Sequence, residues 1–343
     1  LVLGMSLLFT ACDDDDPIID DTDPVETGNI IVSKNISADE TWTSDKVYQL
    51  GGRITVLDGA TLTIEPGTII KGEAGTGANA TALLIARGGK IMAEGTADAP
   101  IIFTSVADEI SPEDVAAGNF GSPNLDPDID GLWGGVIVLG KAKISASNEG
   151  SQLSEVQIEG IPTSDPNGLY GGNDNADNSG VLKYISIRHG GANIGSGNEI
   201  NGLSLGGVGT GTVVENIEVV SNQDDGIEWF GGTVNVTNVL VWNVNDDAID
   251  TDQSWEGTLD NFIIIAPTGH CFELDGPEGT YEAGHTIKNG TVIAGDDNLE
   301  RYAQDLINVD DNSIVDLQNI YFTEIAEGQQ INRVTADGVS FTG

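Results

Sequence analysis

Short runs of alternating apolar and polar residues follow one another along the chain from about residue 41. Examples are RITV at 53–56, TLTI at 61–64 and IIF at 101–103. Runs of this period, rich in β-branched residues and separated by Gly, Asn and Asp, predict short strands. Because no stretch sustains a helical period of apolar residues beyond one or two turns, the pattern predicts an all-β protein.

Three segments in the second half repeat one pattern. They are NIEVVSNQDDGIEWFGG from Asn216, NVLVWNVNDDAIDTDQS from Asn238 and NFIIIAPTGHCFELDGP from Asn261. The leading asparagines are separated by 22 and then 23 residues, a period typical of repeat architectures. Two or three short strands per repeat fit one coil of a parallel β-helix, whereas a propeller blade needs four strands.

Asparagines at one position of successive coils can stack as a ladder, with their side-chain amides hydrogen-bonded from coil to coil. The predicted ladder contains Asn216, Asn238, Asn261, Asn289 and Asn319. Two Gly-, Asn- and Asp-rich stretches, 106–130 and 161–180, interrupt the strands. We expect them to be loops that project from the solenoid, where binding surfaces often form.

The segment GGRITVLDGATLTIEPGTIIKG, followed by GGKIMAEGTADAPIIFTS, resembles the start of a widespread family of bacterial β-helix lipoproteins. NGLSLGGVGTGTVVENIEVVSNQDDGIEWFGGTVNV continues the resemblance, which covers about residues 41–325. The resemblance implies a single-stranded, right-handed parallel β-helix of the pectate-lyase-like type. The resemblance does not imply any enzymatic activity, because no activity is common to the members of this family.

The charge balance narrows the choice of partners. Lys and Arg number 13 against 55 Asp and Glu, which gives a net charge of -42. Such a surface repels phosphates, so we expect no nucleic-acid partner. It attracts divalent cations and basic partners. With two cysteines, Cys12 and Cys271, the chain has no disulfide framework.

The N-terminus has the features of an export signal and a tether. Residues 1–11 are apolar but shorter than the roughly 20 residues of a membrane-spanning helix, and they are typical of the end of a signal peptide. The residues that end at Cys12 resemble the bacterial lipobox, which implies a lipidated Cys12. The aspartates at 13–16 resemble the surface-export signal of Bacteroidota lipoproteins, although an ordinary solvated linker has the same composition.

These features predict three parts. Residues 1–11 end a signal peptide, and residues 12–40 form a lipidated, acidic, disordered tether and cap. Residues 41–343 form the β-helix, and another coil starts at 338–343. Because a β-helix ending there would expose an unpaired edge, we expect either further sequence or a partner that covers the end. The predicted location is the outer membrane, at the cell surface.

A row of carboxylates is predicted on the outside of the coils, because successive side chains of a strand point to opposite sides. The inward position of three aligned strands is apolar and holds Ile227, Ile249 and Phe272. The next position, which faces outward, holds Glu228, Asp250 and Glu273. The following outward position holds Phe230, Asp252 and Asp275. Coils lie about 4.8 Å apart, so these carboxylates crowd together.

Two carboxylates about 5 Å apart repel by about 3 kcal/mol at an effective dielectric constant near 20. The row must therefore take up protons, bind a cation or meet a cationic partner. Clustered carboxylates suit Ca²⁺, and the predicted ligands are Glu228, Asp250, Asp252, Glu273 and Asp275. A hydrated acidic face with raised pKa values is the alternative.

An enzymatic function rests on a second resemblance. The order NQDDGIE, NDDAID, GHC and IKN resembles the order of active-site motifs in polygalacturonases, which hydrolyse glycosidic bonds with carboxylates. The matching residues would be Asp224 or Asp225, Asp246, Asp247, His270 and Lys288. The chain departs from the polygalacturonase motifs at three points. Its first motif has an additional Asp, Cys271 stands where that family has a Gly, and Thr286 stands where it has an Arg. Residues 190–287 contain no Lys or Arg to neutralise an anionic sugar.

We therefore favour a non-catalytic surface module that binds a glycan or a surface protein, for adhesion or nutrient capture. Trp133 and Trp255 are the candidates for stacking on sugar rings. A structural component of an outer-membrane assembly is the third hypothesis. It predicts a specific protein partner and no affinity for glycans.

Overall fold

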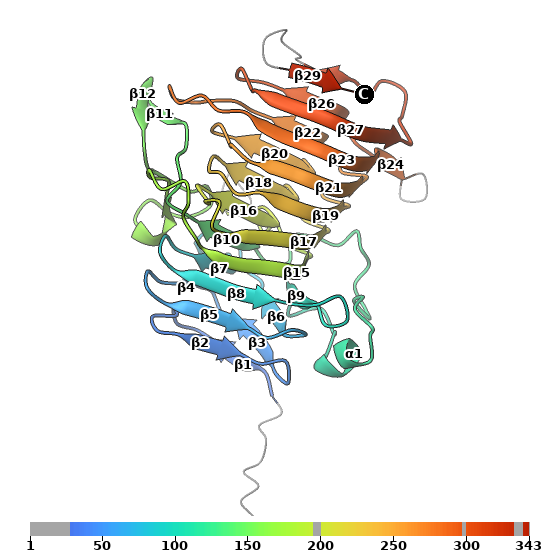
Figure 1. Cartoon of the computed structure of the whole chain (residues 1–343). Helices are drawn as coiled ribbons and strands as arrows, with labels where there is room; N and C mark the ends of the chain where they lie inside the picture. Colours follow the sequence, from blue (N-terminus) through green and yellow to red (C-terminus); the bar gives the residue numbers. More distant parts are fainter. Residues whose placement is uncertain (1–27, 195–199, 297–299, 333–338, 343) are drawn as a thin grey trace, which may run out of the picture.

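The strands wind into one continuous parallel β-helix (Figure 1). The structure is a computed structural model, which describes residues 28–342 apart from 195–199, 297–299 and 333–338. All strand pairs within its two long sheets are parallel. The predicted all-β solenoid is thus confirmed. The predictions for Cys12 and for the acidic tether at 13–27 lie outside the described residues.

One wall is a 14-stranded sheet whose main path runs β1-β3-β6-β9-β15-β17-β19-β21-β23-β27-β29. A branch of three strands, in the order β2-β5-β8, joins this path where β8 pairs with β15. Its strands are β1 (Ile30–Val32), β2 (Glu40–Trp42), β3 (Val47–Leu50), β5 (Thr61–Ile64), β6 (Ile69–Gly72), β8 (Lys90–Glu94), β9 (Ile101–Ser105), β15 (Gly180–Arg188), β17 (Val213–Val220), β19 (Val236–Trp242), β21 (Thr258–Ile265), β23 (His285–Ile293), β27 (Val315–Thr323) and β29 (Val339–Thr342).

The other wall is a nine-stranded sheet in the order β28-β26-β22-β20-β18-β16-β10-β7-β4. Its strands are β4 (Arg53–Val56), β7 (Ala82–Ile85), β10 (Val136–Leu139), β16 (Leu203–Gly206), β18 (Ile227–Phe230), β20 (Ile249–Asp252), β22 (His270–Leu274), β26 (Asp305–Val309) and β28 (Ile331–Asn332). Shorter antiparallel pairs are β11 (Ala146–Asn148) with β12 (Ser151–Leu153), β13 (Val156–Gln157) with β14 (Leu169–Tyr170), and β24 (Gly295–Asp296) with β25 (Arg301–Tyr302). The described helices are α1 (Pro112–Ala116) and two 3-10 turns, Gly77–Asn79 and Pro166–Gly168. None of the helices in the described residues is long and apolar enough to cross a membrane.

A single apolar core fills the space between the two walls and extends from Val32 to Leu317. Its members repeat from coil to coil, as Ile227, Ile249 and Phe272 do on adjacent strands. Trp229 and Trp255 stack inside it with ring centroids 4.7 Å apart. Burial of these inward positions holds each coil in register, because a shift by one residue would turn them outward.

The asparagine ladder forms on the outside of the 14-stranded sheet, in two segments. The Nδ2 of Asn238 donates to the Oδ1 of Asn216 at 3.1 Å, and Asn261 donates to Asn238 at 2.7 Å. Asn319 likewise donates to Asn289 at 2.9 Å, but Asn289 donates to Asp260 rather than to Asn261. All five asparagines have φ between +51° and +63°, a left-handed conformation that Asn tolerates better than most residues.

Two insertions fold back over the walls. Between β9 and β10, Ile110 and Val115 pack on the outer face of the 14-stranded sheet, and a Ser111–Asp114 capping box begins α1. The second insertion starts before the expected residue 161, with the β11–β12 and β13–β14 hairpins. It covers the outer face of the nine-stranded sheet, on the side of the molecule away from α1 (Figure 1). Both segments therefore pack on the walls and do not simply project from them.

Candidate functional site

The carboxylate row lies in register on the nine-stranded sheet. Glu228 of β18 is paired with Asp250 of β20, and Asp250 with Glu273 of β22. The side chains on either side of each carboxylate are buried between the walls, so the carboxylates are on the outside of the wall. Ser204 and Asn308 occupy the same position on the neighbouring coils.

The expectation that this row faces open solvent is wrong for Glu228, which is only 7% exposed. The second insertion and the turn around Asn201 cover it, and the Nδ2 of Asn201 donates a hydrogen bond to the Glu228 carboxylate. Burial, and then the charges of Asp225 and Asp252, raise the pKa of Glu228 well above its usual range. This shift favours the neutral form of the Glu228 carboxyl unless a nearby cation compensates its charge.

The rest of the row is also electrostatically unfavourable. Burial, followed by the charges of Glu228 and Glu273, raises the pKa of Asp250 well above its usual range. A hydrogen bond with Asp247, together with burial, raises the pKa of Glu273 from 4.5 to about 7. Asn308 partly offsets this rise, because its Nδ2 donates to the Oε1 of Glu273 at 2.9 Å.

The structure divides the predicted cation ligands between two places. Oxygens of Asp225, Glu228 and Asp250 all lie within 4.8 Å of one another. The other predicted ligands do not join this trio: Glu273 groups with Asp247 and His270, and Asp252 and Asp275 belong to neither group. Two buried oxygens near the trio, Asp250 Oδ1 and Asn201 Oδ1, accept no hydrogen bond from any described residue. Such atoms are suited to a cation.

A chain of hydrogen bonds runs from the insertion to the end of β20. The hydroxyl of Tyr170 donates to Gln253 Oε1 at 2.9 Å, and Gln253 Nε2 donates to Glu278 Oε1 at 3.2 Å. Glu278 also lies against Asp252, whose pKa is raised well above its usual range by burial and then by the Glu278 charge. The Asp252–Glu278 pair therefore holds a proton or needs a cation.

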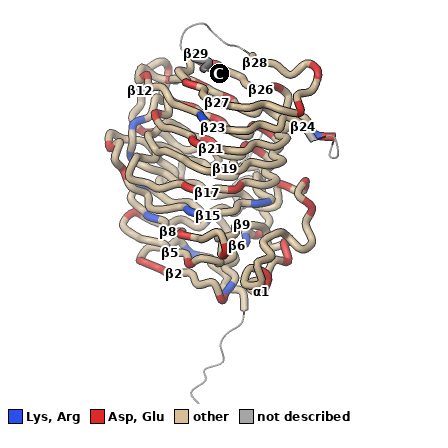
Figure 2. The backbone as a smooth tube through the Cα atoms, turned by 45° about the vertical axis from the view of Figure 1, so that its right-hand side comes forward, with Lys and Arg blue, Asp and Glu red and all other residues tan. Residues whose placement is uncertain are grey.

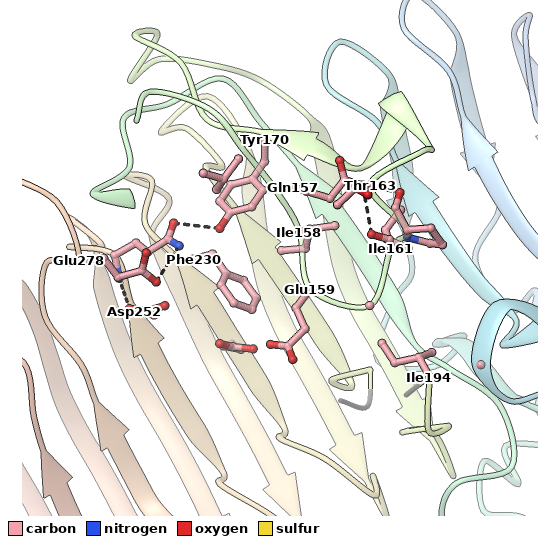
Figure 3. Close-up of a pocket in the computed structure, with 16 residues that line it drawn as sticks. Gln157, Ile158, Glu159, Ile161, Thr163, Tyr170, Ile194, Phe230, Asp252 and Glu278 are labelled. Atoms are coloured by element: carbon pink, nitrogen blue, oxygen red, sulfur yellow. Dashed lines mark hydrogen bonds between the residues drawn. The ribbon is translucent and has the colours of Figure 1, made fainter. Parts of the chain in front are cut away.

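These groups line a cleft of about 760 Å³ between the β13–β14 hairpin and the ends of β18 and β20 (Figure 3). Four of its described lining side chains are carboxylates, and none is Lys, Arg or His. The four are Glu159, Glu228, Asp252 and Glu278. Ile158, Ile161, Ile194 and Phe230 give the cleft an apolar wall. Its volume is typical of a small-ligand site.

Two ion pairs fasten the hairpin that forms one side of this cleft. Arg53 Nη2 lies 3.2 Å from Asp165 Oδ2, and Arg87 Nη1 lies 3.0 Å from Glu155 Oε1. Arg87 also donates to the carbonyl of Gly171 at 2.9 Å. These two arginines are thus engaged by partners on the hairpin and do not line the cleft.

The residues of the polygalacturonase alternative do not form one site. His270 Nδ1 lies 3.0 Å from Asp247 Oδ1, and this hydrogen bond raises the pKa of His270. Lys288, however, is in β23 of the opposite wall, 3.4 Å from Asp260. Each coil of the chain passes through one wall and then the other, so the order of motifs in the sequence does not show which wall a residue occupies. The inclusion of Lys288 is therefore wrong.

Asp225 and Asp247 have structural partners at equivalent turns. The Oδ1 of Asp225 accepts from the backbone N–H of Asp247 at 2.9 Å, and Asp247 Oδ1 accepts from the N–H of His270. Asp224 and Asp246 lie at the same turns, where Asp224, Asp225 and Asp246 form another acidic group within 4.8 Å. None of Asp224, Asp246, Asp247 and His270 lines the cleft.

The prediction that Trp133 and Trp255 stack on sugars is wrong, because both are fully buried. Trp133 Nε1 donates to the carbonyl of Arg188 at 2.7 Å, and Trp255 Nε1 donates to that of Val234 at 3.0 Å. Both indoles therefore pack inside the coils. Cys271 is buried as well, and burial raises the pKa of its thiol.

The sequence prediction missed the residues that the insertion contributes to the cleft. A signal was available in Val156, Gln157, Ile158 and Glu159, where apolar and polar residues alternate. This alternation predicts a segment with one face packed on the wall and the other toward a partner or solvent. Ile158 is buried and Glu159 is exposed, as such a pattern requires.

Three comparisons with known proteins bear on this geometry. Searches among curated proteins and among solved structures found no match. The family model of the pectate-lyase-like β-helix domain matches residues 34–341, which include the carboxylate row, the cleft and all of both walls except β1 and the last residue of β29. The chain therefore belongs to the family of pectate-lyase-like β-helix domains.

Proposed function

We propose that this protein binds a glycan in the cleft between the β13–β14 hairpin and the nine-stranded sheet, without cleaving it. The family supports a carbohydrate-related module. The cleft is the observation on which the proposal rests, because it combines about 760 Å³ of space with an apolar wall and several polar groups. We further propose that a lipid on Cys12 anchors the module to the outer membrane at the cell surface.

A binding role without catalysis accounts for the placement of the ionisable groups. Asp247 and His270, the pair closest to a catalytic arrangement, lie outside the cleft and bond to each other and to backbone. Glu228 and Asp252 inside the cleft both have raised pKa values, so neither is a ready base at neutral pH. A structural component of an envelope assembly remains the competing function, and it predicts no glycan affinity.

A bulky side chain in the cleft tests the proposal. Thr163 lines the cleft and is exposed, so Thr163→Trp should fill the space without disturbing the core. We expect binding to a glycan panel by the unaltered chain, and about tenfold weaker binding, about 1.4 kcal/mol, by Thr163→Trp in calorimetric titration. Thr41→Trp, on exposed β2, is the matched control that should bind normally.

Two outcomes would contradict this function. Absence of binding to every neutral, acidic and basic glycan in the panel would favour the assembly component. Release of reducing ends from any glycan, abolished by Asp247→Asn, would favour the hydrolase.

We also propose that Asp225, Glu228 and Asp250 bind a divalent cation, with Ca²⁺ the best match to their hard oxygen ligands. The closeness of the three carboxylates supports this site, and so do the unpartnered oxygens of Asp250 and Asn201. Bound Ca²⁺ would remove the mutual repulsion of the trio and leave their carboxylates ionised at neutral pH.

Calcium should therefore stabilise the fold. A concentration of Ca²⁺ about 100 times its Kd adds about 2.7 kcal/mol to the free energy of unfolding. We expect the melting temperature to rise by about 5 °C and chelator to reverse the rise. Glu228→Gln should abolish this response, whereas Glu113→Gln on exposed α1 should retain it. A melting temperature that neither Ca²⁺ nor chelator changes would exclude the site.

A further inference from the structure

We propose that the glycan held in the cleft is cationic, an oligosaccharide of amino sugars whose amines are free and protonated. This inference rests on the proposed glycan-binding function and specifies its ligand. The geometry points to a ligand of the opposite charge to a polyuronate such as pectate.

The charge of the cleft is the first argument. Glu159, Glu228, Asp252 and Glu278 line it, and no described lining residue is basic. Arg53 and Arg87, which fasten the hairpin, are already paired with Asp165 and Glu155. Asp and Glu are spread over the whole stack and Lys and Arg are sparse (Figure 2). A polyuronate would meet repulsion both in the cleft and on approach.

The arrangement of the carboxyls is the second argument. The Glu278 carboxyl is positioned by Gln253, which Tyr170 positions in turn, and it lies against Asp252 (Figure 3). Two neighbouring carboxylates repel each other, so a cation between them is favoured. A protonated amine has three N–H donors, so it can bond to both carboxyls at once. Burial strengthens such charge-assisted bonds.

The apolar wall is the third argument, and it favours a sugar over a basic peptide. Ile158, Ile161 and the ring of Phe230 line the same cleft as the carboxylates. The ligand must therefore carry its charge close to an apolar face. An amino sugar meets this requirement, because its ring has a face of C–H groups and carries the amine directly. A lysine side chain instead carries its charge at the end of a flexible four-carbon stem.

The test compares two ligands with the same sugar backbone, one with charged free amines and one with neutral N-acetyl groups. Short glucosamine oligosaccharides, unacetylated or fully N-acetylated, are titrated into the whole chain by calorimetry at about pH 6. Chelator is present so that metal ions do not compete. We expect the unacetylated ligand to bind at least about tenfold more tightly than the acetylated one. We also expect its affinity to fall with added salt.

Three variants locate the charge effect. Glu278→Gln and Glu159→Gln should each weaken binding of the unacetylated ligand by about tenfold. Glu113→Gln, on α1 at the other side of the molecule, is the matched control that should leave affinity unchanged.

The outcomes separate this inference from the proposed function. Equal or tighter binding of the acetylated ligand, or binding of only neutral or acidic glycans, would overturn the amine inference and leave glycan binding intact. Equally tight binding of a short oligolysine would overturn it too, because the cleft would then recognise charge alone. If no glycan of any charge binds, the inference and the proposed function both fail.

Discussion

Raising the pH from about 5 to about 7 is expected to lower the free energy of unfolding of this protein. Glu273 has a folded pKa of about 7 against an ordinary value of 4.5, so in this window the folded chain binds protons that the unfolded chain has released. Stability is therefore highest near the ordinary pKa and falls as the pH rises toward the folded pKa. Discounted for its partial exposure, Glu273 alone contributes about 1.5 kcal/mol.

Buried Glu228, Asp250 and Asp225 act in the same direction, because burial raises the pKa of each well above its usual range. Two buried histidines oppose them. Burial lowers the pKa of His189 and lowers that of His285 to about 3, so both bind protons more readily in the unfolded chain. The carboxyls outnumber these histidines, so the net slope keeps the sign set by the carboxyls. We expect the melting temperature, measured in chelator, to fall by at least about 5 °C across the window. Glu273→Gln should reduce this slope and Glu113→Gln should not. A melting temperature that is constant or rises with pH would contradict the raised pKa values.

Trp229→Ala is expected to lower the free energy of unfolding by about 3–5 kcal/mol. The Trp229 side chain is fully buried between the walls and stacks on Trp255 at 4.7 Å, so its loss leaves a large cavity and an unstacked ring. Chemical denaturation at pH 6 or below provides the measurement. Hydrogen exchange should show lost protection in β16 and β20, the strands on either side of β18.

Trp229→Phe is the matched control. The Nε1 of Trp229 is buried and has no hydrogen-bond partner among the described residues, so losing it removes an unfavourable group. A phenyl ring keeps most of the stacking on Trp255. We therefore expect a cost of less than about 1.5 kcal/mol. If Trp229→Ala costs no more than Trp229→Phe, the stacked pair does not stabilise the core.

The coils and their register were predictable because they follow from local periodicity. Alternation within each strand determines which side chains face inward, and a period of 22 or 23 residues brings Glu228, Asp250 and Glu273 onto neighbouring strands. The same logic predicted the asparagine ladder, apart from its interruption between Asn261 and Asn289. There Asn289 lies opposite Asn261 but donates to the neighbouring Asp260 carboxylate, a charge-assisted bond that the repeat period does not predict.

The surroundings of the site were not predictable in this way. Burial of Glu228 depends on the second insertion, which has no counterpart in other coils to reveal where it folds back. Trp133 and Trp255 are large enough to fill either a core or a binding face, and their sequence context does not distinguish the two. Lys288 was misplaced because a coil passes through both walls, and motif order carries no information about which wall a residue joins.

The asparagine ladder also bears on how such a protein can lengthen. Every amide bond in it runs the same way, from the Nδ2 of a later coil to the Oδ1 of an earlier one. Each coil therefore supplies one donor and one acceptor, and duplication of a 22-residue unit such as 216–237 adds both. Gene duplication can extend the body in whole-coil steps without leaving an unmatched amide, whereas a carboxylate beside the ladder, as at Asp260, takes the donor and starts a new row.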